Sequence, residues 1–151
     1  MSLKYSSPKE TIKNYQESSL ARLEKNDCAV IAIAAASGWD YDTSNSFLRK
    51  EFKREFRKGT LHFHSRMDFL SHYGKTINGK RIYPICGYDG MENGKHRMTV
   101  GSFVKYNPYG TFILAVKNHA FAIKDGNVIG GNLSDAQKLR RILKGAWQIV
   151  D

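Results

Sequence analysis

Three side chains in this sequence, a cysteine, a histidine and an asparagine, could act together in nucleophilic chemistry. Cys28 starts the one long apolar segment, directly after Asn26 and Asp27, two residue types that favour helix N-caps. Unpaired N–H groups and the helix dipole favour a thiolate at such a position. Cys28 is therefore a candidate nucleophile, and the alternative is a buried structural cysteine in a capped core helix.

A predicted hairpin brings the histidine and the asparagine together. The dipeptide Asp125-Gly126 separates two apolar runs and is a strong signal for a two-residue turn. With this turn as the whole loop, His119 lies opposite Asn132, with Cβ atoms about 5 Å apart. The amide oxygen can then orient the imidazole and leave its other nitrogen to serve a thiol. A bulge at Gly130-Gly131 would break this register, and an ordinary polar cross-strand pair is the alternative.

Helices in the first half and strands in the last third are expected to position these residues. The expected helices are 28–37 (stopped by Gly38), 42–57 (capped by Asp42 or Thr43), 66–73 (capped by Ser65), 100–106 (capped by Thr99) and 135–143. The expected strands are 81–85, 111–116, 119–124, 127–131 and 146–150. This pattern predicts an α+β fold in which N-terminal helices, with the Cys28 helix at the centre, pack on a C-terminal antiparallel sheet. We expect residues 1–151 to form a single domain, with 1–22 as an N-terminal arm or a short helix that leads into Cys28.

Length and composition limit the class of protein. A chain of 151 residues with 41% hydrophobic residues and three prolines can bury a core and is not disordered. No run of about 18 apolar residues predicts a membrane span, and residues 1–10 lack the apolar region of a signal peptide. Two cysteines are too few for a disulfide framework, which favours a reducing, cytoplasmic location. Cys86 lacks a helix-start context and is expected to be structural.

The net charge of +10 predicts attraction to anionic surfaces. The expected helix 42–57 carries one strongly basic face, for which a solvated surface is the first interpretation and a nucleic-acid or acidic-protein patch the second. The candidate binding residues on it are Arg49, Lys50, Lys53, Arg54 and Arg57. Three other histidines, His62, His64 and His72, have no acidic or cysteine partners at metal-ligand spacing, so neither a metal site nor a cofactor is expected.

Two blocks of the sequence resemble the papain-like cysteine peptidase superfamily. One is Asn26-Asp27-Cys28 opening the apolar helix, and the other runs from 99–103 through 107–114 to 118–129. The resemblance covers roughly residues 23–129, and is greatest to small single-domain members such as the double-glycine (C39-like) peptidases and phage proteins of similar size. It implies a papain-like fold with Cys28 as the nucleophile and His119 as the base.

Two positions depart from the family pattern. Many relatives carry Asp shortly after the second hairpin strand, where this chain has Gly130-Gly131-Asn132, so Asn132 takes the orienting role on register alone. Papain-like peptidases place a Gln six residues before the cysteine to stabilise the oxyanion, and here that residue is Arg22. Arg22, Asn26 or a backbone N–H is expected to replace it.

The expected function is thiol-dependent hydrolysis of a peptide or isopeptide bond by Cys28, His119 and Asn132. The substrate would be a peptide or protein, with a host protein in the host cytoplasm as a candidate if the chain is phage-encoded. The alternative is a catalytically silent papain-like fold whose basic surface binds nucleic acid, weakly and non-specifically, or an acidic protein. No membrane partner is expected.

Overall fold

A computed structural model describes residues 4–85, 98–130 and 141–151. In these ranges the chain forms six helices and a seven-stranded sheet, which confirms the α+β class. The helices are α1 (Pro8–Thr11), α2 (Ser19–Leu23), α3 (Cys28–Ser37), α4 (Tyr41–Glu51), α5 (Phe63–His72) and α6 (Val100–Tyr106). The strands are β1 (Lys4–Ser6), β2 (Thr76–Ile77), β3 (Lys80–Pro84), β4 (Thr111–Val116), β5 (His119–Lys124), β6 (Asn127–Ile129) and β7 (Gly145–Val150).

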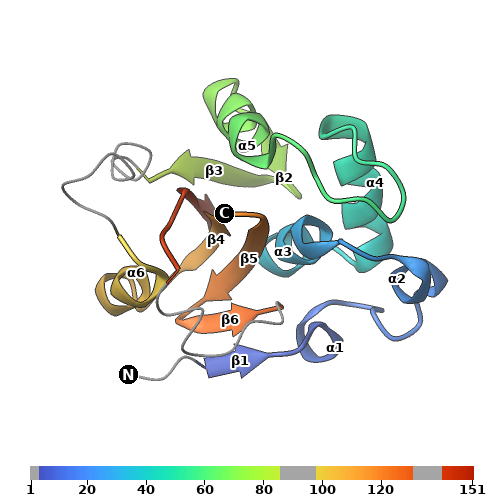
Figure 1. Cartoon of the computed structure of the whole chain (residues 1–151), viewed down its shortest axis with the longest axis horizontal. Helices are drawn as coiled ribbons and strands as arrows, with labels where there is room; N and C mark the ends of the chain where they lie inside the picture. The colour runs from blue at the N-terminus through green and yellow to red at the C-terminus, as the bar shows by residue number, and fades with distance from the viewer. Residues whose placement is uncertain (1–3, 86–97, 131–140) are drawn as a thin grey trace.

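The sheet separates two layers of helices (Figure 1). Its strand order is β1-β6-β5-β4-β7-β3-β2, and the described pairs are antiparallel except β1 with β6. One face packs on the layer that contains α3, α4 and α5, and the other packs on α6. Adjacent strand residues alternate between the layers, so Ala122 joins the α3 core and Phe121 joins the α6 core.

The apolar segment after Asp27 forms α3, the helix at the centre of its layer. All its residues except Cys28 and Ile31 are buried, because it packs chiefly against β5 on one side and α4 on the other. Gly38 ends it at φ +84°, a left-handed conformation that glycine adopts without strain. Cys28 thus lies at the N-terminus of α3, as the sequence predicted.

Turn and capping residues in the sequence also predicted the β5–β6 hairpin and α6 correctly. Asp125 and Gly126 form the turn, and β5 pairs with β6 in the predicted register from Lys124–Asn127 to Ala122–Ile129. Thr99 caps α6 by accepting a hydrogen bond from the Ser102 N–H at 3.1 Å. The pairing ends at Ile129, because Gly130 takes φ +82° and donates its N–H to Ser6 on β1.

Several predicted boundaries in the helical half are wrong. Helix α4 starts from Asp40, whose carboxylate accepts from the Thr43 N–H, and ends at Glu51 rather than at 57. Phe52 is buried and Lys53 adopts φ +56°, so the chain turns inward there. Helix α5 begins at Phe63, not at 66.

The N-terminal segment contains two short helices, in line with one of the two expectations, and is not a separate arm. It contributes β1 to the sheet edge, and α1 and α2 lie beside α3 and α4. The parallel pairing of β1 with β6 also makes the sheet mixed, where an antiparallel sheet was expected. Residues 135–140 of the predicted helix 135–143, Cys86 and Asn132 lie outside the described residues. The end of that helix is wrong, because residues 141–143 are not helical and Ile142 forms an antiparallel bridge with Thr99.

Candidate active site

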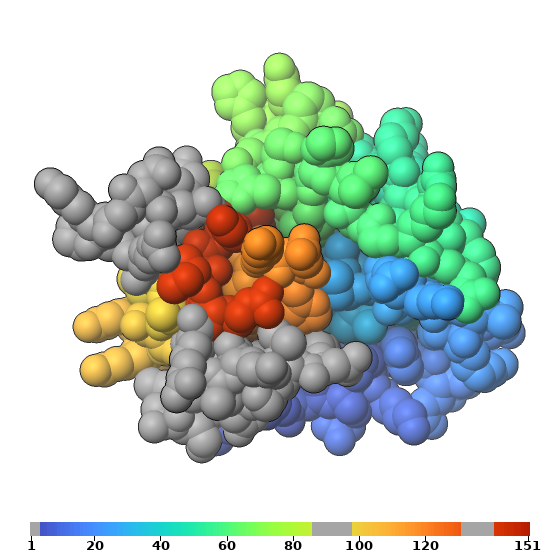
Figure 2. Space-filling model, in the orientation of Figure 1, coloured from blue at the N-terminus to red at the C-terminus, as the bar shows by residue number. Residues whose placement is uncertain are grey.

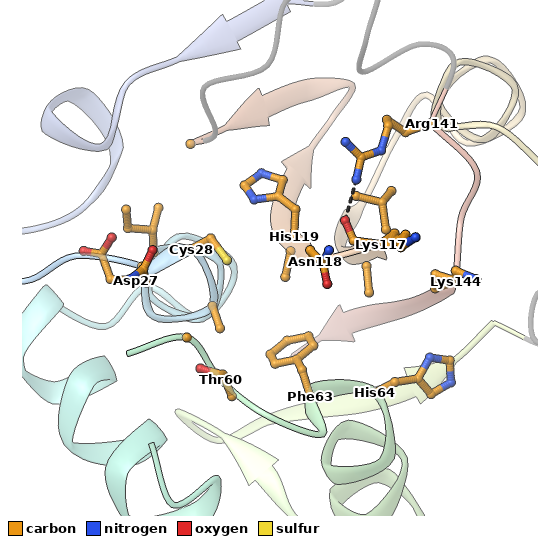
Figure 3. Close-up of a pocket in the computed structure, with 18 of the residues that line it drawn as sticks. Asp27, Cys28, Thr60, Phe63, His64, Lys117, Asn118, His119, Arg141 and Lys144 are labelled. Carbon is orange, nitrogen blue, oxygen red and sulfur yellow. Dashed lines mark hydrogen bonds between the residues drawn. The ribbon is translucent and has the colours of Figure 1, made fainter. Parts of the chain in front are cut away.

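Cys28 lies at the N-terminus of α3 with its sulfur turned toward the start of β5 (Figure 3). The backbone N–H groups of Ala120 and Ala29 both hydrogen-bond to the sulfur. Burial nevertheless raises the pKa of the Cys28 thiol above its ordinary value, and the neighbouring carboxylate of Asp27 adds to the increase. The expectation of a thiolate stabilised by the helix end is therefore wrong, because desolvation outweighs the N–H groups.

His119 is the first residue of β5, directly before the residue whose N–H contacts the Cys28 sulfur. It pairs across the sheet with Val116, and its ring stacks on Phe121 with ring centroids 5.6 Å apart. The stacking fixes the plane of the half-buried imidazole. Figure 3 shows this ring and the Cys28 side chain at the same pocket.

Both residues line a cleft of about 1660 Å³. Its walls come from the start of α3, the β4–β5 turn, the N-terminal segment 5–8, residues 59–64 before and within α5, and residues 141 and 144 before β7. Figure 2 shows these distant parts of the chain, coloured blue, green, orange and red, meeting on one face of the molecule. The sequence gave no sign that 5–8 and 59–64 would reach the site, because only tertiary packing brings them there.

Asp27 is the N-cap residue of α3, but its side chain does not cap the helix. The carboxylate instead accepts a hydrogen bond of 2.6 Å from the Tyr41 hydroxyl. Burial and this hydrogen bond raise the pKa of Tyr41 well above its ordinary range, so the phenol stays protonated and donates. The first-turn N–H groups of α3 are consequently not occupied by the Asp27 side chain.

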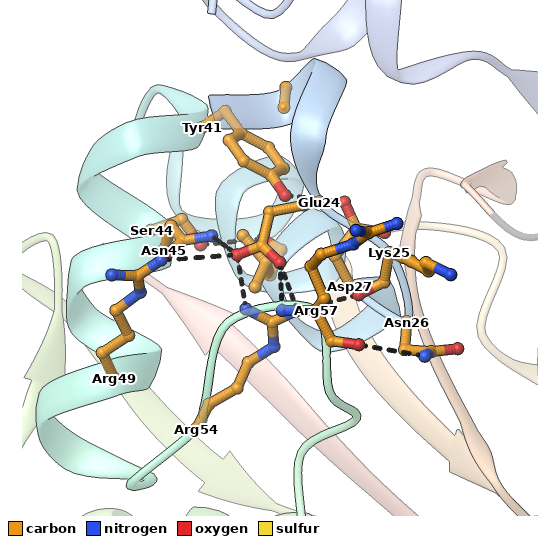
Figure 4. Close-up of polar contacts among 12 residues, drawn as sticks. Glu24, Lys25, Asn26, Asp27, Tyr41, Ser44, Asn45, Arg49, Arg54 and Arg57 are labelled. Atoms are coloured by element: carbon orange, nitrogen blue, oxygen red, sulfur yellow. Dashed lines mark hydrogen bonds and ion pairs between the residues drawn. The ribbon is translucent and has the colours of Figure 1, made fainter. Parts of the chain in front are cut away.

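A buried ionic cluster supports the segment that precedes Cys28 (Figure 4). Glu24 accepts hydrogen bonds from both terminal nitrogens of Arg54, from the Asn45 amide at 2.6 Å and from the Arg57 N–H at 2.7 Å. Burial alone would raise the pKa of Glu24, but these hydrogen bonds outweigh it and lower the pKa to about 2. The cluster joins the α2–α3 connection to the loop that leads into the cleft wall.

This cluster also breaks up the predicted basic face. Arg54 is only 4% exposed and is paired with Glu24, and Arg49 lies 3.7 Å from the same carboxylate. Arg57 points its backbone N–H at Glu24, while Lys50 and Lys53 remain exposed. The predicted continuous surface of these five residues is wrong, because α4 ends before Arg54 and the loop turns it inward.

The two candidates for the oxyanion site are placed differently. Asn26 lines the cleft beside Cys28, with φ +53° and its amide donating to the Arg57 carbonyl at 3.1 Å. Arg22, on α2, does not line the cleft, and its guanidinium donates to the carbonyl of Gln16 at the exposed surface. The structure therefore brings Asn26, and not Arg22, to the nucleophile.

The orienting role of Asn132 stays a prediction, since that residue lies outside the described ranges. The regular register that placed it opposite His119 does not continue, because Gly130 leaves the strand. The break falls at Gly130, the first residue of the pair Gly130-Gly131 where a bulge would have disrupted the register.

His64 forms an unpredicted contact on the cleft wall, where its Nε2 lies 3.2 Å from Oδ2 of Asp68. The other carboxylate oxygen of Asp68 accepts from the Trp147 indole at 2.8 Å. Among the described residues, no group of three or more histidine, cysteine or acidic side chains is arranged to hold a metal ion.

No protein-family model, curated protein or solved structure matches this chain. In the described part of the chain, no helix has both the length and the apolar character needed to cross a membrane.

Proposed function

We propose that this protein is a thiol-dependent hydrolase with a papain-like fold, in which Cys28 is the nucleophile and His119 the general base. One observation carries the proposal: the Cys28 sulfur accepts a hydrogen bond from the N–H that directly follows His119, and both side chains line one cleft. A thiol at a helix start beside a strand histidine has the parts needed for acyl transfer. The bond attacked would be a peptide or isopeptide bond.

The raised pKa of Cys28 determines how the first step of the reaction begins. The resting sulfur keeps its proton, so His119 removes it as the sulfur attacks the carbonyl carbon of the scissile bond. The carbonyl oxygen becomes an oxyanion, for which the first-turn N–H groups of α3 and the nearby Asn26 side chain are the candidate donors. Because Asp27 is held by Tyr41, its carboxylate does not compete for these N–H groups.

The second step releases the products. The tetrahedral intermediate collapses to a thioester on Cys28, and the imidazolium of His119 gives its proton to the departing amine. Water, deprotonated by His119, then attacks the thioester and regenerates the thiol. The stacking of His119 on Phe121 keeps the ring plane constant through both proton transfers.

A generic acyl donor tests this chemistry without knowledge of the substrate. In a Cys86→Ser background, p-nitrophenyl acetate should give a burst of p-nitrophenol equivalent to one acetyl group per protein molecule. Cys28→Ala should remove the burst, and His119→Ala should slow it by about 10²-fold or more, a range typical of a lost general base. His72→Ala is the matched control, since His72 is exposed on α5 and lies outside the cleft.

The pH profile of alkylation separates a working pair from two unrelated residues. If His119 serves Cys28, iodoacetamide should alkylate Cys28 at neutral pH in the parent protein and in His72→Ala. In His119→Ala, alkylation should appear only above the ordinary thiol pKa of 9.0, because burial raises the pKa of Cys28. Neutral-pH alkylation that is unchanged in His119→Ala, or a burst that persists in it, would refute the assignment.

A further inference from the structure

The end of the cleft beyond His119 is basic. Three cationic side chains line it, and we call them the cationic rim: Lys117, Arg141 and Lys144. Figure 3 shows them on the side of His119 that faces away from Cys28. Lys117 is exposed, and the other two are half-buried, so all three can be reached from the cleft.

The rim is held in place by the backbone of the sheet. Arg141 donates from its guanidinium to the carbonyl of Lys117, the first residue of the β4–β5 turn. The Lys144 N–H donates to the Ala115 carbonyl at 2.8 Å, and the Val100 N–H donates to the Arg141 carbonyl at 2.9 Å. These bonds fix the segment before β7 against the turn that precedes His119, so the positions of the cations relative to the catalytic histidine are set by the fold.

The charges along the cleft are unevenly distributed. The acidic side chain among the described cleft-lining residues is Asp27, which lies at the Cys28 end and is engaged by Tyr41. Asp68, which lies behind the cleft-lining residue His64, has one carboxylate oxygen paired with His64 and the other accepting a hydrogen bond from the Trp147 indole. Within the described part of the chain, neither Lys117 nor Arg141 forms an ion pair with a carboxylate.

We propose that the cationic rim binds a carboxylate of the substrate while the scissile bond lies at Cys28. This inference rests on the proposed hydrolase function and specifies its substrate class: a peptide that is acidic on the side that extends past His119. Arg141 keeps guanidinium N–H groups beyond the one used on Lys117, and a guanidinium can bind a carboxylate through two of them. The carboxylate belongs either to an Asp or Glu side chain or to the peptide C-terminus.

Binding to Cys28→Ala measures this preference separately from turnover. Four fluorescently labelled glycine–alanine peptides serve as probes: a neutral amide, the same peptide ending in a C-terminal carboxylate, an amide with two Asp residues, and an amide with two Lys residues. One of the two carboxylate-bearing peptides, the free acid or the Asp amide, should bind about tenfold more tightly than the Lys peptide in low salt. The difference should shrink as salt is added. Tighter binding of the Asp amide identifies a side-chain carboxylate as the ligand, and tighter binding of the free acid identifies the C-terminus.

Charge reversal at the rim should remove the preference. Lys117→Glu with Arg141→Glu should weaken binding of the preferred peptide about tenfold, because repulsion replaces two attractions. The matched control is Lys75→Glu with Lys105→Glu, two exposed lysines outside the cleft, which change the net charge by the same amount. The control variant should retain the preference.

Two outcomes would overturn the inference: equal binding of all four peptides, or equal losses in the rim variant and the control variant. The second would show that the whole positive protein attracts acidic peptides without a site. The acetyl burst tests the hydrolase proposal independently of these binding measurements. If the acetyl burst is absent while the rim-dependent preference remains, the rim binds carboxylates without the proposed chemistry.

Discussion

Replacing Glu24 by Gln should destabilise the protein strongly at neutral pH and hardly at all in acid. The Glu24 side chain is fully buried, as is the guanidinium of Arg54 that it contacts at 2.8 Å. The substitution removes the negative charge, keeps the shape, and leaves Arg54 buried without its counter-ion. Removing one partner of a buried pair typically costs about 3–5 kcal/mol.

The pKa of Glu24 gives a second route to the magnitude. A carboxyl whose pKa falls from 4.5 in the unfolded chain to about 2 in the folded protein contributes about 3 kcal/mol, at 1.36 kcal/mol per pKa unit. Because the folded pKa is the lower one, this contribution is complete above the unfolded pKa of 4.5. It is lost as the pH falls through 4.5 toward 2, where Glu24 becomes protonated in both states.

Urea denaturation from about pH 7 to pH 2 measures the effect. The free energy of unfolding of the parent should exceed that of Glu24→Gln by about 3 kcal/mol at pH 7, and the two curves should converge in acid. Glu55→Gln is the matched control, because Glu55 pairs with Lys58 where both side chains are 72% exposed, and it should change stability by less than about 1 kcal/mol. A difference between parent and Glu24→Gln that stays constant with pH would show that Glu24 does not act through its charge.

Two further substitutions test packing next to the site. Gly130→Ala should cost about 2–3 kcal/mol, because its Cβ would lie 2.9 Å from Cγ2 of Ile31 at φ +82°. Gly79→Ala has a similar φ of +75° and nothing within 4 Å, so it should cost only about 1 kcal/mol, and equal losses in urea denaturation would rule out the clash. Tyr41→Phe should lower stability by about 1–3 kcal/mol through the lost hydrogen bond to Asp27, and an unchanged melting temperature would contradict that role.

The parts of the fold that the sequence predicted depend on short-range signals. The turn at Asp125-Gly126 fixes which strand residues face each other, and the Thr99 side chain caps its own helix. Each signal involves atoms a few residues apart, so the sequence contains it directly. The start of α3 at Cys28 was predicted for the same reason.

The errors concern contacts between distant residues. Nothing near Arg54 in the sequence shows that it pairs with Glu24, thirty residues earlier, so the charge pattern was interpreted as a longer helix with a solvated face. The prediction of a thiolate at Cys28 is wrong for a similar reason. Its helix-end position is local and favours a thiolate, whereas its burial, which prevails, results from tertiary packing. The register failed at Gly130, where pairing with β1 rather than the hairpin determines the backbone.

The distance between nucleophile and base depends on how closely α3 approaches the sheet. Helix α3 packs on β5, and Ala29 and Ala32 of α3 belong to the same core cluster as Ala122 of β5. Small side chains on both surfaces let the helix lie close to the strand, and this allows the Ala120 N–H to reach the Cys28 sulfur. The alternation along β5 places His119 and Phe121 on the other face, where the two rings stack at the edge of the cleft. Alanine packing on one face of β5 and ring stacking on the other therefore set the geometry of the proposed Cys28–His119 pair.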